Sequence, residues 1–376
     1  MDYYRFKYEQ LKKISDDIFK GFGFSQEEAE IITDVLITAD LFGIESHGIQ
    51  RLARYYNGIK NNSIHIHEKP EVVFETPVSA TVDGHEGMGQ LIAVECMKLA
   101  IEKAKKSGVG MVTVRNSNHF GIAGYYSKMA TDRGLIGISM TNSESLMVPT
   151  NAKKAVLGSN PIAVSAPAHP IPFWFDAATV VVPRGKLEVY NKLSKPLHDG
   201  WAVDENGVSC SDAAHVLEGI SKNTNGGILP LGGADEATGS HKGYGFGMIC
   251  EIFTSILSGG PTSNHHAKTA GKGAGTSHFF MAIDPAIFGD PSAVQQRLSV
   301  LLEELRGAPV ADGKLRIFTH GEKEQMAARK HLTEGIDVNI NTLAEIKTIF
   351  DYLKIDSVPY IGDLDFTGTK KSIYET

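Results

Sequence analysis

The pattern of apolar residues changes twice along the chain, and this limits the folds that the chain can adopt. The first sixty residues and the tail after residue 290 repeat apolar side chains at helical spacing. Between them, from about Val72, short β-rich runs alternate with helical segments. The sequence therefore predicts a mixed α/β fold in which helical segments precede and follow a body of strands and helices.

Local signals mark individual elements of this pattern. Ser25 and Glu28 form a capping box ahead of an apolar helical repeat, and Gly21, Gly23, Gly108 and Gly134 stand where helices are expected to stop. We expect strands at 80–83, 109–114, 136–141, 163–165 and 173–175. We expect helices at 8–20, 45–59, 91–106, 123–133, 244–257, 293–306, 323–334 and 342–353.

Composition and charge exclude several classes of protein. The chain has 376 residues and a formal net charge of −7, and it lacks a long basic run, which argues against a nucleic-acid partner. No apolar run approaches the ~20 residues that span a bilayer, and the first residues lack the apolar core of a signal peptide. Cys96, Cys210 and Cys250 form neither a disulfide framework nor a CxxC pair. We expect a cytoplasmic protein that does not contact the membrane.

The segment from Ser46 to Tyr55 carries the first candidate site. His47, Arg51 and Tyr55 are spaced four residues apart, so in a helix at 45–59 they fall on neighbouring turns of one face. An arginine can bind a carboxylate through two parallel hydrogen bonds, and a histidine can exchange a proton. This set suits a small substrate with a carboxylate beside a carbonyl or hydroxyl group. A polar helix face exposed to solvent is the alternative.

A second polar segment ends an apolar run. Residues 110–114 read as a short buried strand, and Asn116, Ser117, Asn118 and His119 follow it closely. Loops at the end of a rigid strand often carry functional residues. A turn in which the asparagine and serine side chains bond their own backbone is the alternative, but such a turn does not require His119.

Lys242 could bind a phosphate, although the chain has no G-x-G-x-x-G after a strand and no G-x-x-x-x-G-K-[ST]. Lys242 stands beside glycines near the start of a predicted helix, where free N–H groups favour a phosphate; close packing of small residues is the alternative. Asp176 follows the apolar run 173–175 and alone reads as a helix N-cap. Ser143 follows the strand at 136–141 and alone reads as a turn residue.

Other chemistries have less support. His265, His266 and His278 suggest a metal site, but the chain has no H-x-x-x-H or H-E-x-x-H pattern and few acidic residues nearby, so we expect no metal. The absence of a G-x-S-x-G nucleophile elbow argues against a serine hydrolase. A non-catalytic binding or scaffold protein is the remaining alternative, and the candidate site around His47 argues against it.

Several short motifs occur in one order along nearly the whole chain. They lie at 46–48 with Arg51, 116–121, 158–161, 176–179, 184–186, 242–245 and 278–280. Together they resemble the family of NAD(P)-dependent malate and L-lactate dehydrogenases that lack a Rossmann fold. Relatives in this family include sulfolactate and ureidoglycolate dehydrogenases and 2,3-diketogulonate reductase. Segment 183–207 resembles the malate and sulfolactate branch most.

The resemblance implies a particular domain organisation. A helical domain is formed by both chain ends, with its N-terminal part at 1–72 and its C-terminal part at 291–376. The cofactor-binding α/β domain at 73–290 is built around a largely antiparallel sheet, not a Rossmann fold. The resemblance also implies a homodimer whose cofactor sites lie close to the subunit contact.

The resemblance further implies reversible, nicotinamide-dependent oxidation of malate to oxaloacetate, with L-lactate, sulfolactate or ureidoglycolate as the alternative substrate. NAD is the expected cofactor and NADP the alternative. Arg51 holds the substrate carboxylate and Tyr55 assists it. His47 and His119 flank the reacting oxygen with Ser46, and we favour His47 as the proton-exchanging residue because its helix also bears Arg51.

The resemblance assigns a further group of residues to the cofactor site. These are Ser143, Asp176, Ala177, Ala178, His241, Lys242, Glu322 and Lys323. Ala177 and Val180 stand where the family usually has Met and Ser, and His320 stands where it usually has Pro.

Overall fold

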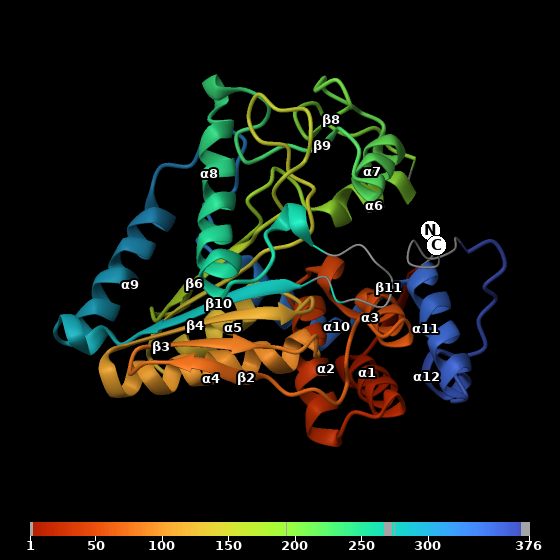
Figure 1. Ribbon diagram of the computed structural model, residues 1–376, viewed down its shortest axis with the longest axis horizontal. Coiled ribbons are helices and arrows are strands. Elements are labelled where there is room, and N and C mark those ends of the chain that lie inside the picture. Colours follow the sequence, from red (N-terminus) through yellow and green to blue (C-terminus); the bar gives the residue numbers. More distant parts are fainter. Residues whose placement is uncertain (1–2, 193, 267–272, 274, 370–376) are drawn as a thin grey trace.

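The protein is described by a computed structural model that covers residues 3–192, 194–266, 273 and 275–369. Figure 1 shows a twisted sheet flanked by helices, and a group of helices beside one end of that sheet. This arrangement confirms the predicted mixed α/β fold class. Within the described ranges, we find no helix both long and apolar enough to cross a membrane.

The sheet has seven strands in the order β2-β3-β4-β10-β5-β6-β7. Of the described pairs in this sheet, β3 and β4 run parallel and the others antiparallel, so the predicted largely antiparallel sheet is confirmed. The strands are β2 (Glu71–Glu75), β3 (Ser79–Asp83), β4 (Val109–Ser117), β5 (Ile136–Thr141), β6 (Ile162–Ala166), β7 (Phe173–Ala177) and β10 (Thr276–Ile283). Because β10 lies between β4 and β5, a segment far along the sequence completes the centre of the sheet.

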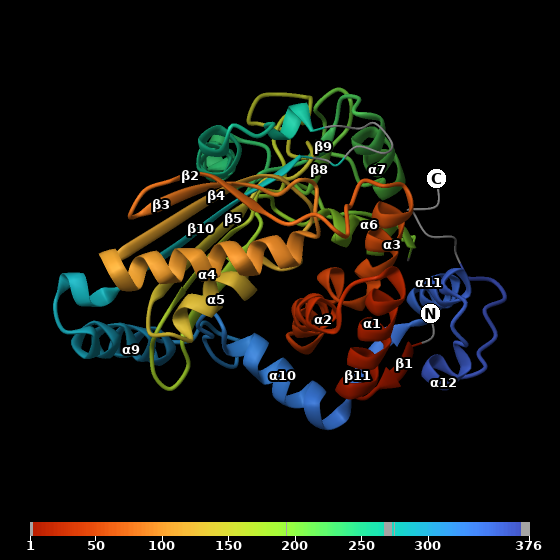
Figure 2. The same cartoon turned by 60° about the horizontal axis from the view of Figure 1, so that its bottom comes forward.

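Helices cover both faces of the sheet, as Figure 2 shows. On one face, α4 (Gly89–Ser107) and α5 (Ala123–Thr131) pack on buried strand residues such as Val112 and Phe280. On the other face lie α8 (Ser240–Glu251) and its π-helical continuation η4 (Ile252–Ile256), where Cys250 packs on Met140 and Phe279. The sheet is therefore the middle layer of this part of the molecule.

The two ends of the described chain meet in the helical part. The strand β1 (Tyr3–Phe6) pairs antiparallel with β11 (Ile336–Asn339). One apolar core joins α1 (Tyr8–Phe22), α2 (Gln26–Leu41) and α3 (Leu52–Lys60) to α11 (Ile340–Leu353), and it includes Phe19, Tyr55 and Phe350. The short helix α12 (Val358–Ile361) follows α11.

The segment after residue 290 makes contacts with both parts of the molecule. Helix α9 (Pro291–Gly307) follows the short turn η6 (Pro285–Phe288), and its Ser299 hydroxyl accepts a hydrogen bond from the backbone N–H of His169 at 2.9 Å. In Figure 2, α9 lies well away from α1 and α11. Helix α10 (Glu322–Glu334) instead contacts α2. The division of the chain at 72/73 and 290/291 stays a prediction.

A smaller lobe between β7 and α8 went largely unpredicted. It contains α6 (Arg184–Lys192), α7 (Ala213–Lys222), the two-residue strands β8 (Ala202–Val203) and β9 (Gly227–Ile228), and the turn η3 (Glu236–Thr238). The turn η5 (Ser263–His265) follows α8 and η4. The lobe has its own apolar core, which includes Leu187, Val216 and Ile228.

The predicted continuous helix at 45–59 is wrong. Two 3₁₀ turns, η1 (Glu45–His47) and η2 (Ile49–Arg51), precede α3, and between them Gly48 has φ −88° and ψ −147°. The carboxyl group of Asp40 on α2 causes the break, since it accepts a hydrogen bond from Ile49 N–H at 2.7 Å. A Cβ atom on Gly48 would lie 1.8 Å from Asp40 Oδ1, so only glycine fits there.

Most of the local signals are confirmed. Ser25 and Glu28 form the capping box of α2, and Gly23, Gly108 and Gly134 adopt positive φ after the helices that they end. The stop expected at Gly21 is wrong, because α1 continues to Phe22. Helix α8 begins at Ser240, four residues before the predicted start, which places Lys242 in its first turn.

Candidate active site

A pocket of about 210 Å³ lies where the helical part meets the end of the sheet. The predicted residues that line it are His47, Arg51, His119 and Ser143. The other lining side chains include Arg54, Thr141, Asn142, Glu144, Ser159, Arg184 and Glu188. The turn η1–η2, helix α3, the ends of β4 and β5, and helix α6 therefore all contribute to one site.

Two stacked imidazole rings form the centre of the pocket wall. The rings of His47 and His119 are 5.6 Å apart between centroids and inclined by 24°. Ser46 Oγ lies 2.9 Å from His47 Nδ1, and the Tyr55 hydroxyl lies 2.7 Å from His119 Nδ1. The structure thus brings together residues from two distant segments that the sequence singled out separately.

Burial and neighbouring arginines keep both histidines neutral. Burial, followed by the charges of Arg51 and Arg54, lowers the pKa of His47 to about 3. Burial and then Arg54 lower the pKa of His119 well below its ordinary value, with smaller contributions from His47 and Arg51. Neutral imidazole can accept a proton, so each ring can serve as a base in this state.

The hydrogen bonds of His119 define which of its nitrogens faces a ligand. The backbone N–H of Gly121 donates to His119 Nδ1 at 3.4 Å, so this nitrogen acts as an acceptor. The Tyr55 hydroxyl, on a fully buried side chain, can donate to the same atom. A neutral His119 then carries its proton on Nε2, which can donate a hydrogen bond to a substrate oxygen.

The asparagines before His119 hold the turn in place. Asn118 is buried, and its amide group donates to the carbonyl oxygens of Glu86 and Gly87 at 2.8 and 3.1 Å. Asn116 has φ +52° and its amide donates to Asp83 at 3.0 Å. These contacts reach other segments of the chain, whereas the alternative from sequence was a turn that bonds its own backbone.

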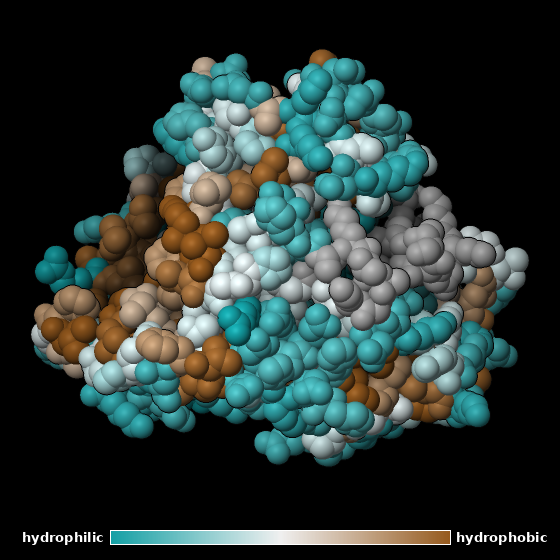
Figure 3. Space-filling view, viewed as in Figure 1, coloured by the Kyte–Doolittle hydropathy of each residue, from teal (hydrophilic) through white to brown (hydrophobic). Residues whose placement is uncertain are grey.

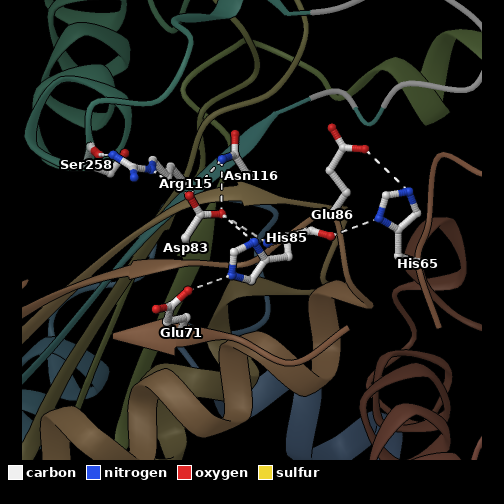
Figure 4. Close-up of polar contacts among 8 residues, drawn as sticks. All are labelled: His65, Glu71, Asp83, His85, Glu86, Arg115, Asn116 and Ser258. Carbon is white, nitrogen blue, oxygen red and sulfur yellow. Dashed lines mark hydrogen bonds and ion pairs between the residues drawn. The ribbon is translucent and has the colours of Figure 1, made fainter. Parts of the chain in front are cut away.

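Figure 4 shows the wider network around Asp83, at the ends of β3 and β4. Arg115 Nε pairs with Asp83 at 2.9 Å, and its Nη1 donates to the Ser258 carbonyl at 3.3 Å. His85 lies between Asp83 and Glu71, at 3.6 and 3.2 Å. The network ties β2, β3, β4 and the segment after η4 together, and so supports the turn that carries His119.

Three arginines line the pocket, but they have different partners. Arg184 pairs with Glu144 at 2.8 Å and with Glu188 at 3.1 Å, so both pocket glutamates bind the same guanidinium. Arg51 is buried, and its Nε donates to the carbonyl oxygen of Ser46. Arg54 was missed from the sequence, although its position three residues after Arg51 was a usable signal.

Ser143 is the predicted cofactor residue that lines this pocket. Its backbone N–H donates to Asn160 Oδ1 at 3.1 Å, and its hydroxyl lies 3.3 Å from that of Ser159. A Cβ on Gly158 would come within 2.5 Å of both Asn160 and Ser143, so a glycine is required for this close turn. The turn presents two serine hydroxyls beside the histidines.

The remaining predicted cofactor residues lie outside this pocket. Asp176 ends β7 with Ala177, and its carboxylate accepts from Gly124 N–H at 2.6 Å. Burial raises the pKa of Asp176 to about 6, a rise that the Gly124 hydrogen bond opposes and Glu324 reinforces. Ala178 follows directly and is half-buried.

The turn that carries Glu322 and Lys323 is attached to β7. Trp174 N–H donates to the carbonyl oxygen of His320 at 3.2 Å, which brings this turn beside Asp176. The Glu322 carboxylate accepts from Thr319 N–H at 2.7 Å, and Lys323 Nζ lies 5.1 Å from the Phe318 ring centroid. Two of the predicted groups are therefore neighbours.

His241 and Lys242 form a separate group. Both are exposed in the first turn of α8, where backbone N–H groups point out of the helix end. Neither residue lines the pocket that holds His47 and His119.

The histidines that suggested a metal have other surroundings: His266 lines the pocket with His47 and His119, and His265 Nδ1 lies 2.8 Å from Thr262 Oγ1. His278 is fully buried in β10, with Thr141 Oγ1 2.8 Å from its Nδ1 and Ser117 Oγ 2.8 Å from its Nε2. Its ring stacks on Phe120 at 4.4 Å. No group of three or more His, Cys, Asp or Glu residues in the described part of the chain is arranged to hold a metal ion.

Two buried acids near the site were missed because no local pattern marks them. Asp40 anchors the turn that carries His47, and burial raises its pKa to about 8, with Ile49 N–H opposing the rise. Glu251 on α8 accepts from the Asn160 amide at 2.9 Å and from the hydroxyls of Ser255 and Ser263. Each acid holds a loop that reaches the pocket.

The comparisons with known proteins agree with this architecture. The family model described as malate/L-lactate dehydrogenase matches residues 6–347. Malate dehydrogenase from Pyrococcus horikoshii is 42% identical over 348 residues, covering 93% of this chain and 95% of the relative. L-Sulfolactate dehydrogenase from Methanocaldococcus jannaschii is 36% identical over 365 residues, covering 94% and 99%.

Solved structures give the same result. The crystal structure of malate dehydrogenase from Entamoeba histolytica has a TM-score of 0.91 and 36% identity, covering 94% of this chain and 99% of that one. The structure of malate dehydrogenase from Pyrococcus horikoshii has a TM-score of 0.86 and 40% identity, covering 94% and 97%.

These findings and the pocket define a nicotinamide-dependent dehydrogenase of hydroxy acids. The chain belongs to the malate/L-lactate dehydrogenase family, so the predicted resemblance is confirmed.

Proposed function

We propose that the protein is a malate dehydrogenase, which reversibly oxidises malate to oxaloacetate. The observation that carries the proposal is the pair of neutral histidines beside Arg51 and Arg54 in one pocket. The 42% identity to a malate dehydrogenase over nearly the whole chain supports the choice of substrate. Sulfolactate is the second candidate substrate, since relatives at 36% identity are named sulfolactate dehydrogenases. L-Lactate and ureidoglycolate are further alternatives.

The chain's own residues bind the substrate and move its proton. Arg51 binds the carboxylate next to the reacting carbon, with Tyr55 assisting through His119. His119 Nε2–H donates a hydrogen bond to the substrate oxygen. If His47 Nδ1 donates to Ser46 Oγ, His47 Nε2 is left to accept the hydroxyl proton, which keeps His47 as our choice for the base. A bound nicotinamide would supply the hydride chemistry at the same carbon.

The negative charge of the substrate should also affect the pKa of the two histidines. Arg51 and Arg54 lower the pKa of both histidines in the free protein. An anionic substrate neutralises these arginines, so its binding should raise the histidine pKa toward the pH at which proton transfer is efficient.

The pocket and its surroundings fit a dinucleotide. The hydroxyls of Ser143 and Ser159 suit the polar nicotinamide end, and the exposed Lys242 and His241 at the start of α8 suit the phosphates. We further propose that NAD is the cofactor, with NADP as the alternative. The other proposed contacts are Asp176, Ala177, Ala178, Glu322 and Lys323.

An unusually apolar face supports the proposed homodimer. Figure 3 shows it over α8, η4 and α9, extending to β2. It includes the exposed side chains of Phe74, Phe246, Ile252, Ile256, Leu257 and Leu301. Contiguous apolar surface of this kind is typical of subunit contacts. Sedimentation equilibrium should show a dimer that Ile256→Asp weakens. The control Leu332→Asp should leave it intact, since Leu332 on α10 is about as exposed as Ile256. A wild-type monomer with full activity would refute the dimer.

We also propose a cytoplasmic location. Cys96, Cys210 and Cys250 are free thiols, and Cys96 and Cys250 are buried. Free cysteines suit a reducing compartment.

A substrate panel tests the proposed reaction. Oxaloacetate, sulfopyruvate, pyruvate and the 2-oxo acid of ureidoglycolate are each offered with NADH and NADPH, and nicotinamide absorbance is followed. We expect the highest kcat/KM with oxaloacetate and NADH. Turnover of none of these acids would overturn the proposed function.

The histidine roles need a separate measurement. His47→Gln and His119→Gln should each lower kcat by about 10²–10⁴-fold. Only His47→Gln should also remove the acidic limb of the pH profile for malate oxidation. If that limb disappears in His119→Gln alone, the base is His119.

A further inference from the structure

Arg54 is placed to meet a second charged group on the substrate. It lies in the second turn of the segment formed by η2 and α3, three residues after Arg51, and it lines the pocket with His47 and His119. Residues three apart on a helix have Cβ atoms about 5–6 Å apart and lie on the same side. The two guanidinium groups therefore approach the pocket from neighbouring positions on one surface.

Among the described residues, Arg54 has no acidic partner. Both glutamates that line the pocket, Glu144 and Glu188, pair with Arg184. Across the described ranges, Arg54 forms no ion pair with a carboxylate. A half-buried cation is costly unless an anion compensates it, and the two neighbouring histidines are neutral.

We propose that Arg54 is the specificity-determining residue of the pocket, and that it binds the second anionic group of a 2-oxo or 2-hydroxy acid. This rests on the proposed function. Arg51 takes the carboxylate beside the reacting carbon, and Arg54 takes the carboxylate or sulfonate at the other end of a short chain. A monocarboxylate such as lactate leaves Arg54 unpaired, so the pocket selects diacids over monoacids.

A matched pair of substrates tests this selection. Oxaloacetate and 2-oxobutyrate share a four-carbon chain, but only oxaloacetate has a second carboxylate, and sulfopyruvate carries a sulfonate instead. We compare kcat/KM for the three acids in the wild type, Arg54→Gln, Arg54→Lys and Arg51→Gln. Lys60→Gln, which removes an exposed positive charge at the other end of α3, is the control.

Arg54→Gln should lower kcat/KM for oxaloacetate by about 10- to 100-fold, the range for losing one charge-assisted contact, and should change that for 2-oxobutyrate by less than about threefold. Arg54→Lys should restore part of the selectivity. Arg51→Gln should lower kcat/KM for oxaloacetate and for 2-oxobutyrate by similar factors. Lys60→Gln should behave as the wild type. An equal decrease of kcat/KM for sulfopyruvate and oxaloacetate in Arg54→Gln would show that Arg54 recognises the charge of the second group and not the shape of a carboxylate.

Two results would overturn the proposal. If Arg54→Gln lowers kcat/KM for oxaloacetate and 2-oxobutyrate equally, or raises the KM of the cofactor instead, Arg54 does not bind the second acid group. If its selectivity equals that of the wild type, Arg54 does not contact the substrate. Failure of the wild type to reduce any of the three acids refutes the proposed function itself and is distinguishable from both.

Discussion

Gly48→Ala should damage the active site more than its small size suggests. The added Cβ would lie 1.8 Å from Asp40 Oδ1, about 1.6 Å short of the 3.4 Å at which ordinary contact begins. The Asp40 side chain cannot rotate away, because it is buried on α2 and accepts a hydrogen bond from Ile49 N–H. The turn between η1 and η2 must therefore move.

The cost has two sources. Overpacking a buried site costs about 1–3 kcal/mol, and the strained Ile49 hydrogen bond adds about 1 kcal/mol. We expect a loss of about 2–4 kcal/mol in the free energy of unfolding. Because His47 and Arg51 flank the turn, a shift of about 1 Å should also lower kcat/KM on the order of 100-fold.

Urea denaturation and steady-state kinetics measure the two effects. Gly307→Ala at the end of α9 is the control, since its added Cβ meets no atom within 4 Å. In the double variant Asp40→Ala/Gly48→Ala, the collision is removed, so its stability should exceed the value expected from adding the two single losses. Gly48→Ala with wild-type stability and activity would refute this account of the turn.

Three further predictions concern charge. Burial raises the pKa of Asp40 from 3.8 to about 8, so its contribution to stability is complete below pH 3.8 and is lost as pH rises to about 8. Asp40→Asn should flatten the dependence of the free energy of unfolding on pH over that window, and an unchanged dependence would contradict the shift. Arg51→Lys should lose about 2–3 kcal/mol of transition-state stabilisation for every 2-oxo acid tested, and normal kcat/KM would remove Arg51 from the substrate site. Lys242→Ala should raise the KM of the cofactor more than that of the substrate, whereas equal changes would count against a phosphate contact.

Local signals predicted much of the fold. The strand expected at 136–141 is β5, residue for residue, because alternating apolar residues and a preceding glycine stop define it locally. The strand at 109–114 continues to Ser117 as β4. The seven-stranded order could not be read from such signals, since β10 joins β4 and β5 through contacts between distant segments.

The site was predictable to a smaller extent. His47 and His119 were found from their separate motifs, but their stacking depends on how η1 meets the turn after β4. The break at Gly48 depends on Asp40, which the pattern around 45–59 does not reveal. The strands β8 and β9 were missed because two-residue strands leave no periodic pattern.

The pairing of β1 with β11 has a consequence for the order in which the protein matures. During synthesis, the chain leaves the ribosome from its N-terminus, and segments fold as their partners emerge. The sheet with His119 can assemble once β10 is made, but β1, α1 and α3 must wait for β11 and α11. The half of the pocket that bears His47 and Arg51 is therefore completed after the half that bears His119, so a nascent chain cannot act on its substrate until β11 and α11 have been translated.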